Sequence, residues 1–267
     1  MKIVVLGSGT SVPHPLRAAS AHWLETAHGS LLLDASAAAL HRMAVENLDW
    51  ANLDAIWISH FHLDHVGGLA PFLFATKHAP QTAGRRKPLT IFGGRGLRKL
   101  LRAFDGANNY GLLKQAFAIE IREVAPRVEF EILKGLRART LSTPHTRESL
   151  ALRLTEESGA SLVYTSDTGY VEALADFARD VELLIMECSF RRAKPVETHL
   201  ELADAMRVAT SANPRRVVLT HLYPEWDGVD IRAEAAKLWP GETIGASDGL
   251  RLEVGKEQPR VGGQASD

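Results

Sequence analysis

A dense group of histidines follows an apolar segment in the first quarter of the chain. Residues 55–58 read Ala-Ile-Trp-Ile, which has the length and composition of a buried β-strand. Residues 59–65 read Ser-His-Phe-His-Leu-Asp-His, and Gly67-Gly68 and a predicted short helix at 69–76 follow them. Three imidazoles and one carboxylate therefore crowd the turn between a buried strand and a helix. The chain must adopt a fold in which a strand delivers these polar side chains at its end.

The spacing of these side chains is typical of a metal site. Side chains alternate along an extended segment, so we expect His60 and His62 to point the same way. Asp64 and His65 come as the chain turns into the helix, where their directions diverge from that pair. The four side chains could thus serve two metal ions, and imidazole and carboxylate are ligands that zinc accepts. A polar turn with surface histidines is the alternative interpretation.

Composition excludes several classes of protein. The chain has 267 residues, is 45% hydrophobic and carries a formal net charge of −1, which argues against binding to polyanions through bulk charge. Cys188 is the only cysteine, so no disulfide can form within the chain. No apolar stretch approaches the length of a membrane span, and the N-terminus lacks the features of a signal peptide. We therefore expect a cytoplasmic protein that does not engage membranes.

Two features near the N-terminus have competing interpretations. Gly7-Ser8-Gly9 follows a predicted strand at 2–6, but position 12 is Val and Pro13 prevents a helix from starting, so we reject a dinucleotide-binding loop. These glycines could still contact a phosphate or a metal site. Asp34 ends a second predicted strand before a helix expected at 35–45. Its carboxylate could cap that helix or hold a metal-binding histidine.

A run of basic residues has no acidic neighbours. No Asp or Glu occurs between residues 77 and 102, and the stretch contains Lys77, Arg85, Arg86, Lys87, Arg95, Arg98, Lys99 and Arg102. The pattern predicts a loop around 80–88, a strand at 89–92 and a helix at 95–104. The run is either a solvated loop with an exposed helix face or a cationic rim that attracts a phosphate-bearing substrate.

The second half of the chain repeats the pattern of a strand that ends in a polar residue. A metal-competent side chain follows each of three predicted strands: His145 after 138–143, Asp167 after 161–165 and His221 after 216–220. Ligands in open α/β folds gather at the carboxyl edge of a sheet. Four such strands, counting the one before His60, predict a shared metal site. For Asp167, the alternative is turn chemistry in Ser-Asp-Thr-Gly.

These residues resemble the metallo-β-lactamase superfamily. The resemblance rests on His60-x-His62-x-Asp64-His65, His145, Asp167 and His221, with Asp34 upstream. It implies an α/β fold, a four-layer αβ/βα metallo-β-lactamase sandwich of two mixed sheets flanked by helices, with a dinuclear zinc site at one edge. It further implies that His60, His62 and His145 hold the first zinc ion, that Asp64, His65 and His221 hold the second, and that Asp167 bridges both.

The resemblance extends over residues 1–254, which we take as a single hydrolase domain. Residues 255–267 lack an apolar pattern and are expected to form a disordered tail. Two Zn²⁺ ions are the expected cofactors, with Mn²⁺ or Fe²⁺ as alternatives. A homodimer is compatible with this family.

Further details indicate a branch of the superfamily. β-Lactamases usually carry a cysteine where Asp167 stands, and flavodiiron proteins carry a glutamate where His62 stands. Residues 186–190, Met-Glu-Cys-Ser-Phe, and residues 198–201, Thr-His-Leu-Glu, resemble the ribonuclease Z group and the phosphodiesterase of bacterial phosphonate breakdown. The chain lacks the long Gly/Pro-rich insertion that grips tRNA. A phosphodiesterase is therefore favoured over a tRNA-processing enzyme.

The expected reaction is hydrolysis of a phosphodiester, carried by a small molecule or by RNA, through a hydroxide that two metal ions share. We assign catalytic roles to Asp64, which would orient or deprotonate the water, and to His199, which would stabilise charge or protonate the leaving group. Glu187 would tune His199, which is expected to open a helix at 200–210. The alternatives are a hydrolase of lactones, carboxylic esters or thioesters on the same metals, and a non-catalytic metal-binding protein.

Overall fold

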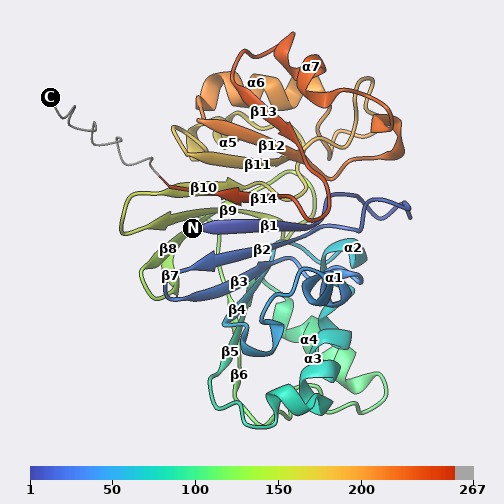
Figure 1. Cartoon of the computed structure of the whole chain (residues 1–267), viewed down its shortest axis with the longest axis vertical. Helices are drawn as coiled ribbons and strands as arrows, with labels where there is room; N and C mark the ends of the chain where they lie inside the picture. The colour runs from blue at the N-terminus through green and yellow to red at the C-terminus, as the bar shows by residue number, and fades with distance from the viewer. Residues whose placement is uncertain (256–267) are drawn as a thin grey trace, which may run out of the picture.

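Several strands are buried along their whole length, because both faces of their sheets are covered. All residues of β4 (Ala55–Ile58), β10 (Ser161–Tyr164) and β11 (Leu183–Glu187) are buried. Strands covered on both faces read as continuous apolar runs. The computed structural model, which describes residues 1–255, accordingly has two β-sheets between two layers of helices (Figure 1).

The first sheet has seven strands in the order β14-β1-β2-β3-β4-β5-β6. Strands β3 to β6 are parallel, whereas β14, β1, β2 and β3 pair antiparallel. Its other strands are β1 (Lys2–Gly7), β2 (Ala21–Thr26), β3 (Gly29–Leu33), β5 (Leu89–Gly93), β6 (Ile119–Glu123) and β14 (Arg251–Glu253).

The second sheet also has seven strands, in the order β13-β12-β11-β10-β9-β8-β7. Strands β10 to β13 are parallel and the rest antiparallel, so both sheets are mixed, as predicted. Its other strands are β7 (Glu129–Leu133), β8 (Leu136–Ser142), β9 (Leu150–Glu156), β12 (Arg216–Thr220) and β13 (Glu242–Gly245).

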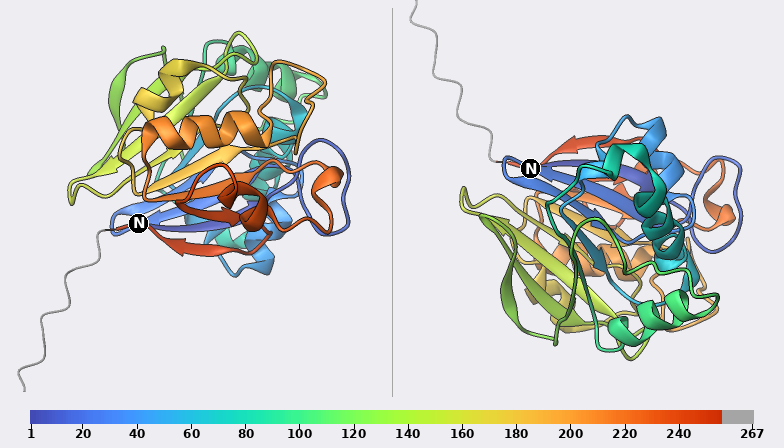
Figure 2. Two further views of the ribbon diagram at one scale, coloured as in Figure 1. Left: turned by 90° about the horizontal axis from the view of Figure 1, so that it is seen from above. Right: turned by 90° about the horizontal axis from the view of Figure 1, so that it is seen from below.

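Helices cover the outer face of each sheet (Figure 2). One buried apolar cluster fills the space between the sheets, a second joins the first sheet to α1, α3 and α4, and a third joins the second sheet to α5, α6 and α7. The α-helices are α1 (Ala39–Val45), α2 (Leu63–Val66), α3 (Leu69–His78), α4 (Leu97–Gly106), α5 (Glu172–Phe177), α6 (Leu202–Ala212) and α7 (Ile231–Ala236). Three short 3₁₀ helices are η1 (Trp50–Asn52), η2 (Pro80–Thr82) and η3 (Pro224–Trp226). The predicted four-layer sandwich is confirmed.

The structure shows what Gly7 and Asp34 contact. A side chain at Gly7 would place its Cβ 1.8 Å from the carbonyl oxygen of Ala19, so this glycine permits close contact between two backbone segments. Helix α1 starts at Ala39, four residues later than expected, and no side chain caps it. Asp34 therefore does not cap the helix; its carboxylate bonds to His65.

The two ends of the described chain meet. Strand β14 pairs antiparallel with β1, and the amino group of Met1 donates a hydrogen bond of 2.9 Å to the carbonyl oxygen of Val254. The predicted tail at 255–267 lies, apart from Gly255, outside the described residues. Among residues 1–255, no helix is long and apolar enough to cross a membrane.

Candidate metal centre

The predicted donors converge at one edge of the sandwich, although they come from both sheets. His60 and His62 follow β4 of the first sheet, whereas His145, Asp167 and His221 follow β8, β10 and β12 of the second. Asp64 and His65 lie on α2. The donor atoms form two groups, each within 4.8 Å, that share one carboxylate: His60, His62, His145 and Asp167 in the first, and Asp64, His65, Asp167 and His221 in the second.

In the first group the donor atoms lie close enough for one ion. His145 Nε2 is 3.0 Å from His62 Nδ1 and 3.6 Å from Asp167 Oδ2, and His60 Nε2 is 3.7 Å from Asp167 Oδ2. Nitrogen and oxygen ligands at zinc distances in a tetrahedron lie about 3.3–3.6 Å apart. The donor atoms of this group are therefore close enough together for one ion to contact all of them.

The second group has the same spacing. His65 Nε2 lies 3.2 Å from Asp167 Oδ1 and 3.7 Å from Asp64 Oδ2. His221 Nε2 lies 3.4 Å from Asp64 Oδ2 and 3.4 Å from Asp167 Oδ2. Asp167 thus presents one oxygen to both groups and the other to His65, as a bridging carboxylate would.

Three of the imidazoles use their Nδ1 atom, which points away from the shared carboxylate, in a hydrogen bond that orients the ring. His65 Nδ1 donates to Asp34 Oδ2 at 2.7 Å, and His145 Nδ1 donates to the carbonyl oxygen of Thr198 at 3.0 Å. Ser189 donates its proton to Glu187, so its Oγ accepts the Nδ1 proton of His221 at 2.9 Å. Because Nδ1 of each ring is engaged in this way, Nε2 is the nitrogen that faces the carboxylates and would bind a metal ion.

Buried polar atoms without partners support a cation at this position. His60 Nε2, His65 Nε2 and Asp167 Oδ1 are buried and make no hydrogen bond of good geometry, although the last two atoms lie 3.2 Å apart. Such atoms are costly in a folded protein unless an ion or another partner satisfies them. Imidazole nitrogens and carboxylate oxygens are the donors that zinc and similar divalent ions accept, so the residues present fit a metal site.

Opposite charges lie close together at the site. Burial alone would raise the pKa of Asp167, but His221 and His65 hold it well below its usual value. Burial would likewise lower the pKa of His65, yet the carboxylates of Asp167 and Asp34 outweigh it and raise that pKa well above the ordinary range. The field that attracts a proton here also attracts a metal ion.

A third group of side chains lies beside the second. Glu187 is buried and accepts from Thr168 N, Ser189 Oγ and Leu200 N, at 2.6, 2.6 and 3.2 Å. His199 Nδ1 donates to Glu187 Oε1 at 2.9 Å. Because donors already surround Glu187, we interpret it as the support of His199 rather than as a ligand. His199 itself precedes α6, which begins at Leu202 instead of the predicted residue 200.

Some residues that support the donors did not stand out in the sequence. Ser59, Ser189 and Tyr164 bond to the donors or to their carboxylate partners, and Ser166 bonds to Ser59. Serine is common at turns, so its residue type carries little signal. Their positions in the sequence are the only indication of a supporting role, since Ser59 and Ser166 each directly precede a predicted donor.

The basic run divides into two parts, and the first does not border the site. Residues 85–87 precede β5, which is parallel to β4, so they lie at the edge of the sheet opposite His60. Arg85 is buried and donates to the carbonyl oxygens of Ala51, Leu53, Lys87 and Pro88. Only the segment after β5, with the exposed Arg95 next to Gly96, lies near the site, because a Cβ at Gly96 would be 3.2 Å from Phe61.

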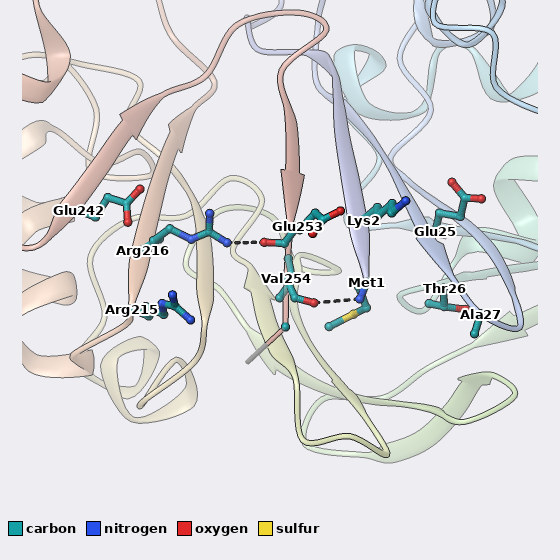
Figure 3. A pocket seen from close by; sticks show the side chains of 11 residues that line it. Met1, Lys2, Glu25, Thr26, Ala27, Arg215, Arg216, Glu242, Glu253 and Val254 are labelled. Carbon is teal, nitrogen blue, oxygen red and sulfur yellow. Dashed lines mark hydrogen bonds between the residues drawn. The ribbon is translucent and has the colours of Figure 1, made fainter. Parts of the chain in front are cut away.

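A cavity of about 710 Å³ opens at the other end of the sandwich (Figure 3). Side chains of both charges line it, among them Lys2 and Arg216, which begin β1 and β12, and Glu242. His221 follows the opposite end of β12, so this cavity is separate from the donor groups.

The fold and the clustered donors define the class of the chain, a metal-dependent hydrolase of the metallo-β-lactamase fold. The crystal structure of the metallo-β-lactamase fold protein YhfI from Bacillus subtilis superimposes with a TM-score of 0.79 at 25% identity, covering 94% of this chain and 98% of that one. The short form of human tRNase Z has a TM-score of 0.76 at 20% identity over 95% of this chain and 99% of its own, which supports the fold alone.

Sequence comparison agrees. The probable metallo-hydrolase YhfI of Bacillus subtilis (strain 168) is 28% identical over 257 residues, which cover 95% of this chain and all of that protein. A ribonuclease Z of Methanosarcina acetivorans is 26% identical, over an alignment that covers 95% of this chain and 98% of the ribonuclease. The chain belongs to the family of the anti-Pycsar protein Apyc1, whose model matches residues 1–239. The prediction of a metal-dependent hydrolase near the ribonuclease Z branch is confirmed.

Proposed function

We propose that this protein hydrolyses phosphodiesters with two divalent metal ions, zinc being the first choice and Mn²⁺ or Fe²⁺ the alternatives. The first ion would be held by His60, His62 and His145, the second by Asp64, His65 and His221, and Asp167 would lie between them. Bound ions of this kind lower the pKa of water and neutralise charge on phosphoryl oxygens.

The observation that carries the proposal is the position of His199. Its ring centroid lies 4.8 Å from that of His145 and 5.4 Å from that of His221, so it borders both donor groups without belonging to the seven donors. Burial would lower the pKa of His199, but the hydrogen bond and the charge of Glu187 raise it above its usual value of 6.5. A protonated imidazole beside the metals suits an anionic substrate whose leaving oxygen needs a proton.

Two side chains would move or hold protons in the reaction. The pKa of Asp64 is about 2, because the hydrogen bond from His221 and the charge of His65 outweigh the effect of burial, so Asp64 is a carboxylate that accepts a proton or a hydrogen bond from water. His199 would donate its proton from Nε2 to the leaving oxygen, while Nδ1 stays bonded to Glu187. This division gives the base and the acid to different residues.

The names of related proteins favour phosphorus–oxygen chemistry. One relative is named ribonuclease Z, and a fold neighbour is titled a diphosphatase of the PhnP family. We infer that the substrate of this chain is a small phosphodiester or RNA, and we favour the small diester because the sequence lacks a tRNA-gripping insertion.

A substrate panel tests the proposal. Zinc- and manganese-loaded protein is assayed on bis(p-nitrophenyl) phosphate, cyclic nucleotides, a tRNA precursor and a lactone, with and without EDTA. We expect EDTA-sensitive cleavage of at least one diester, and no cleavage by Asp167→Asn, which lacks the shared carboxylate. Lactone hydrolysis without cleavage of any diester would favour the esterase alternative and overturn the proposal.

A further inference from the structure

Asp34 is a buried hub with four donors. Ser59 N donates to its Oδ1 at 2.8 Å, and Oδ2 accepts from Ser59 Oγ at 2.8 Å, from His65 Nδ1 at 2.7 Å and from Tyr164 OH at 2.7 Å. Asp34, Ser59 and His65 have no exposed surface, and Tyr164 is 1% exposed. Four hydrogen bonds from the protein itself therefore stabilise this carboxylate.

The hub determines where each hydroxyl proton goes. A carboxylate can only accept, so the single hydroxyl proton of Ser59 is donated to Asp34. Ser166 Oγ donates to Ser59 Oγ at 2.6 Å. His60 Nδ1 lies 3.0 Å from Ser59 Oγ and 3.5 Å from Ser166 Oγ, and because both hydroxyls donate their protons elsewhere, this nitrogen is the donor. Ser59 thus donates one hydrogen bond and accepts two, which exhausts its capacity.

This arrangement fixes the tautomer of His60. With the proton on Nδ1, the buried Nε2 has a lone pair directed toward Asp167, 3.7 Å away. We propose that Ser59, supported by Ser166, is a positioning residue that holds His60 in the ligating tautomer and couples the two donor groups through Asp34. The coupling arises because the carboxylate that orients His65 of the second group also orients His60 of the first, through Ser59. The proposal rests on the proposed function in taking both histidines as ligands.

The tautomer is tested first, in the wild-type protein stripped of metal. Long-range ¹H–¹⁵N spectra of ¹⁵N-histidine-labelled protein at neutral pH distinguish the two neutral forms, and the His60 signals are those lost in His60→Gln. We expect the Nδ1-protonated form. A His60 protonated on Nε2 overturns the proposal, and this measurement is independent of activity and of metal loading.

Metal affinity is tested next, by competition with a chromophoric chelator. Changes in residues that support a histidine ligand cost about 10–100-fold in metal affinity. We expect Ser59→Ala to lower the affinity for one zinc equivalent by about that factor. Ser59→Thr keeps the hydroxyl and should retain most of the wild-type affinity. Asp34→Asn should weaken both equivalents. The control is Ser36→Ala, which removes a nearby buried hydroxyl that bonds only to the Ala19 carbonyl.

The outcomes separate this proposal from the proposed function. The role of Ser59 would be overturned if Ser59→Ala bound two zinc equivalents as tightly as the wild type does. An equal loss of zinc affinity in Ser36→Ala would overturn it as well. If Ser59→Thr does not fold, Ser166→Ala takes its place and should shift the His60 ¹⁵N signals without a change in zinc stoichiometry. A wild-type protein that binds both ions and shows the expected tautomer, yet cleaves no diester, would contradict the proposed function alone.

Discussion

At His199, burial and a neighbouring carboxylate act on the same proton in opposite directions. The carboxylate of Glu187 prevails, so the pKa of His199 is raised and the ring stays protonated at a higher pH than an ordinary histidine. A protonated group of this kind helps a reaction in proportion to how much the leaving group needs a proton.

His199→Ala should keep two metal equivalents and its fold, but should lose about 10²–10⁴-fold in kcat on alkyl or ribose diesters. The loss should be smaller on bis(p-nitrophenyl) phosphate, because nitrophenolate leaves without a proton. In the wild type, the advantage on alkyl diesters should be complete below the pKa of His199 and disappear as the pH rises through it. Kinetics on both substrates and elemental analysis provide the measurement. Equal losses on both substrates would indicate charge stabilisation rather than proton donation.

Asp167→Asn should lose at least one metal equivalent. The side chain of Asp167 contacts donors of both groups, and its negative charge offsets the repulsion between two cations, whereas an amide supplies no charge. Elemental analysis after dialysis measures the loss. Full occupancy by two ions in this variant would be incompatible with a bridging carboxylate.

At the scale of elements, the strand ends could be predicted from the sequence, but the turns that follow them could not. Each donor follows a run of strand-forming residues, so its position at the sheet edge was readable. Asp34, Ser166 and His221, however, have φ values of 58°, 51° and 58°, in the left-handed region that residues other than glycine seldom adopt. The backbone of these turns is set by contacts between distant segments, such as the bond between Ser166 and Ser59, 107 residues apart.

The joint between the loop after β3 and helix α3 depends on Gly68. A Cβ at this position would lie 2.0 Å from the carbonyl oxygen of Ser36, and Gly68 N already donates to Ala35 O at 2.8 Å. Gly68→Ala should therefore lower the free energy of unfolding by about 2–3 kcal/mol, measured by urea denaturation. Gly84→Ala is the matched control, since no atom lies within 4 Å of its added Cβ. Similar stability of the two variants would mean that the joint can relax.

Arg85 shows why the basic run could not be assigned from the sequence. Its charge suggested a substrate contact, yet its guanidinium donates to four backbone carbonyls and lies 4.2 Å from the ring centroid of Phe117. Arg85→Lys cannot supply the same planar set of donors and should cost about 2–4 kcal/mol of stability. The exposed Arg86→Lys should stay within about 0.5 kcal/mol of wild type. Thermal unfolding measures the stability of both variants. If Arg85→Lys is as stable as the wild type but has a raised KM, Arg85 contacts the substrate after all.

For the molecule as a whole, His22 predicts a loss of stability in acid. It is fully buried, neither ring nitrogen has a partner, and burial lowers its pKa from 6.5 to about 4, the lowering being larger than the opposite effect of Asp34. His22 therefore binds a proton near pH 6.5 in the unfolded chain but only near pH 4 in the folded protein. The free energy of unfolding should fall as the pH falls through this window, by about 3 kcal/mol for the difference 6.5 − 4.

His22→Leu should flatten this part of the stability curve, because the apolar side chain takes up no proton in either state. Urea denaturation between pH 7 and 4 measures the slope, with the exposed His41→Leu on α1 as the control that should keep the wild-type slope. An unchanged slope in His22→Leu would assign the acid sensitivity to other groups.

Because β1 pairs with β14, we expect the fold to tolerate a different starting point of the chain. The amino group of Met1 lies 2.9 Å from the carbonyl oxygen of Val254 (Figure 3), so a short linker could close residues 1–254 into a ring. The ring could be reopened at Gly159, an exposed residue between β9 and β10 with no atom near its Cβ position. Such a circular permutant would synthesise the strands that carry Asp167 and His221 first and the histidine-rich turn afterwards. Only the order of synthesis would change, because every strand would keep the neighbours it has now.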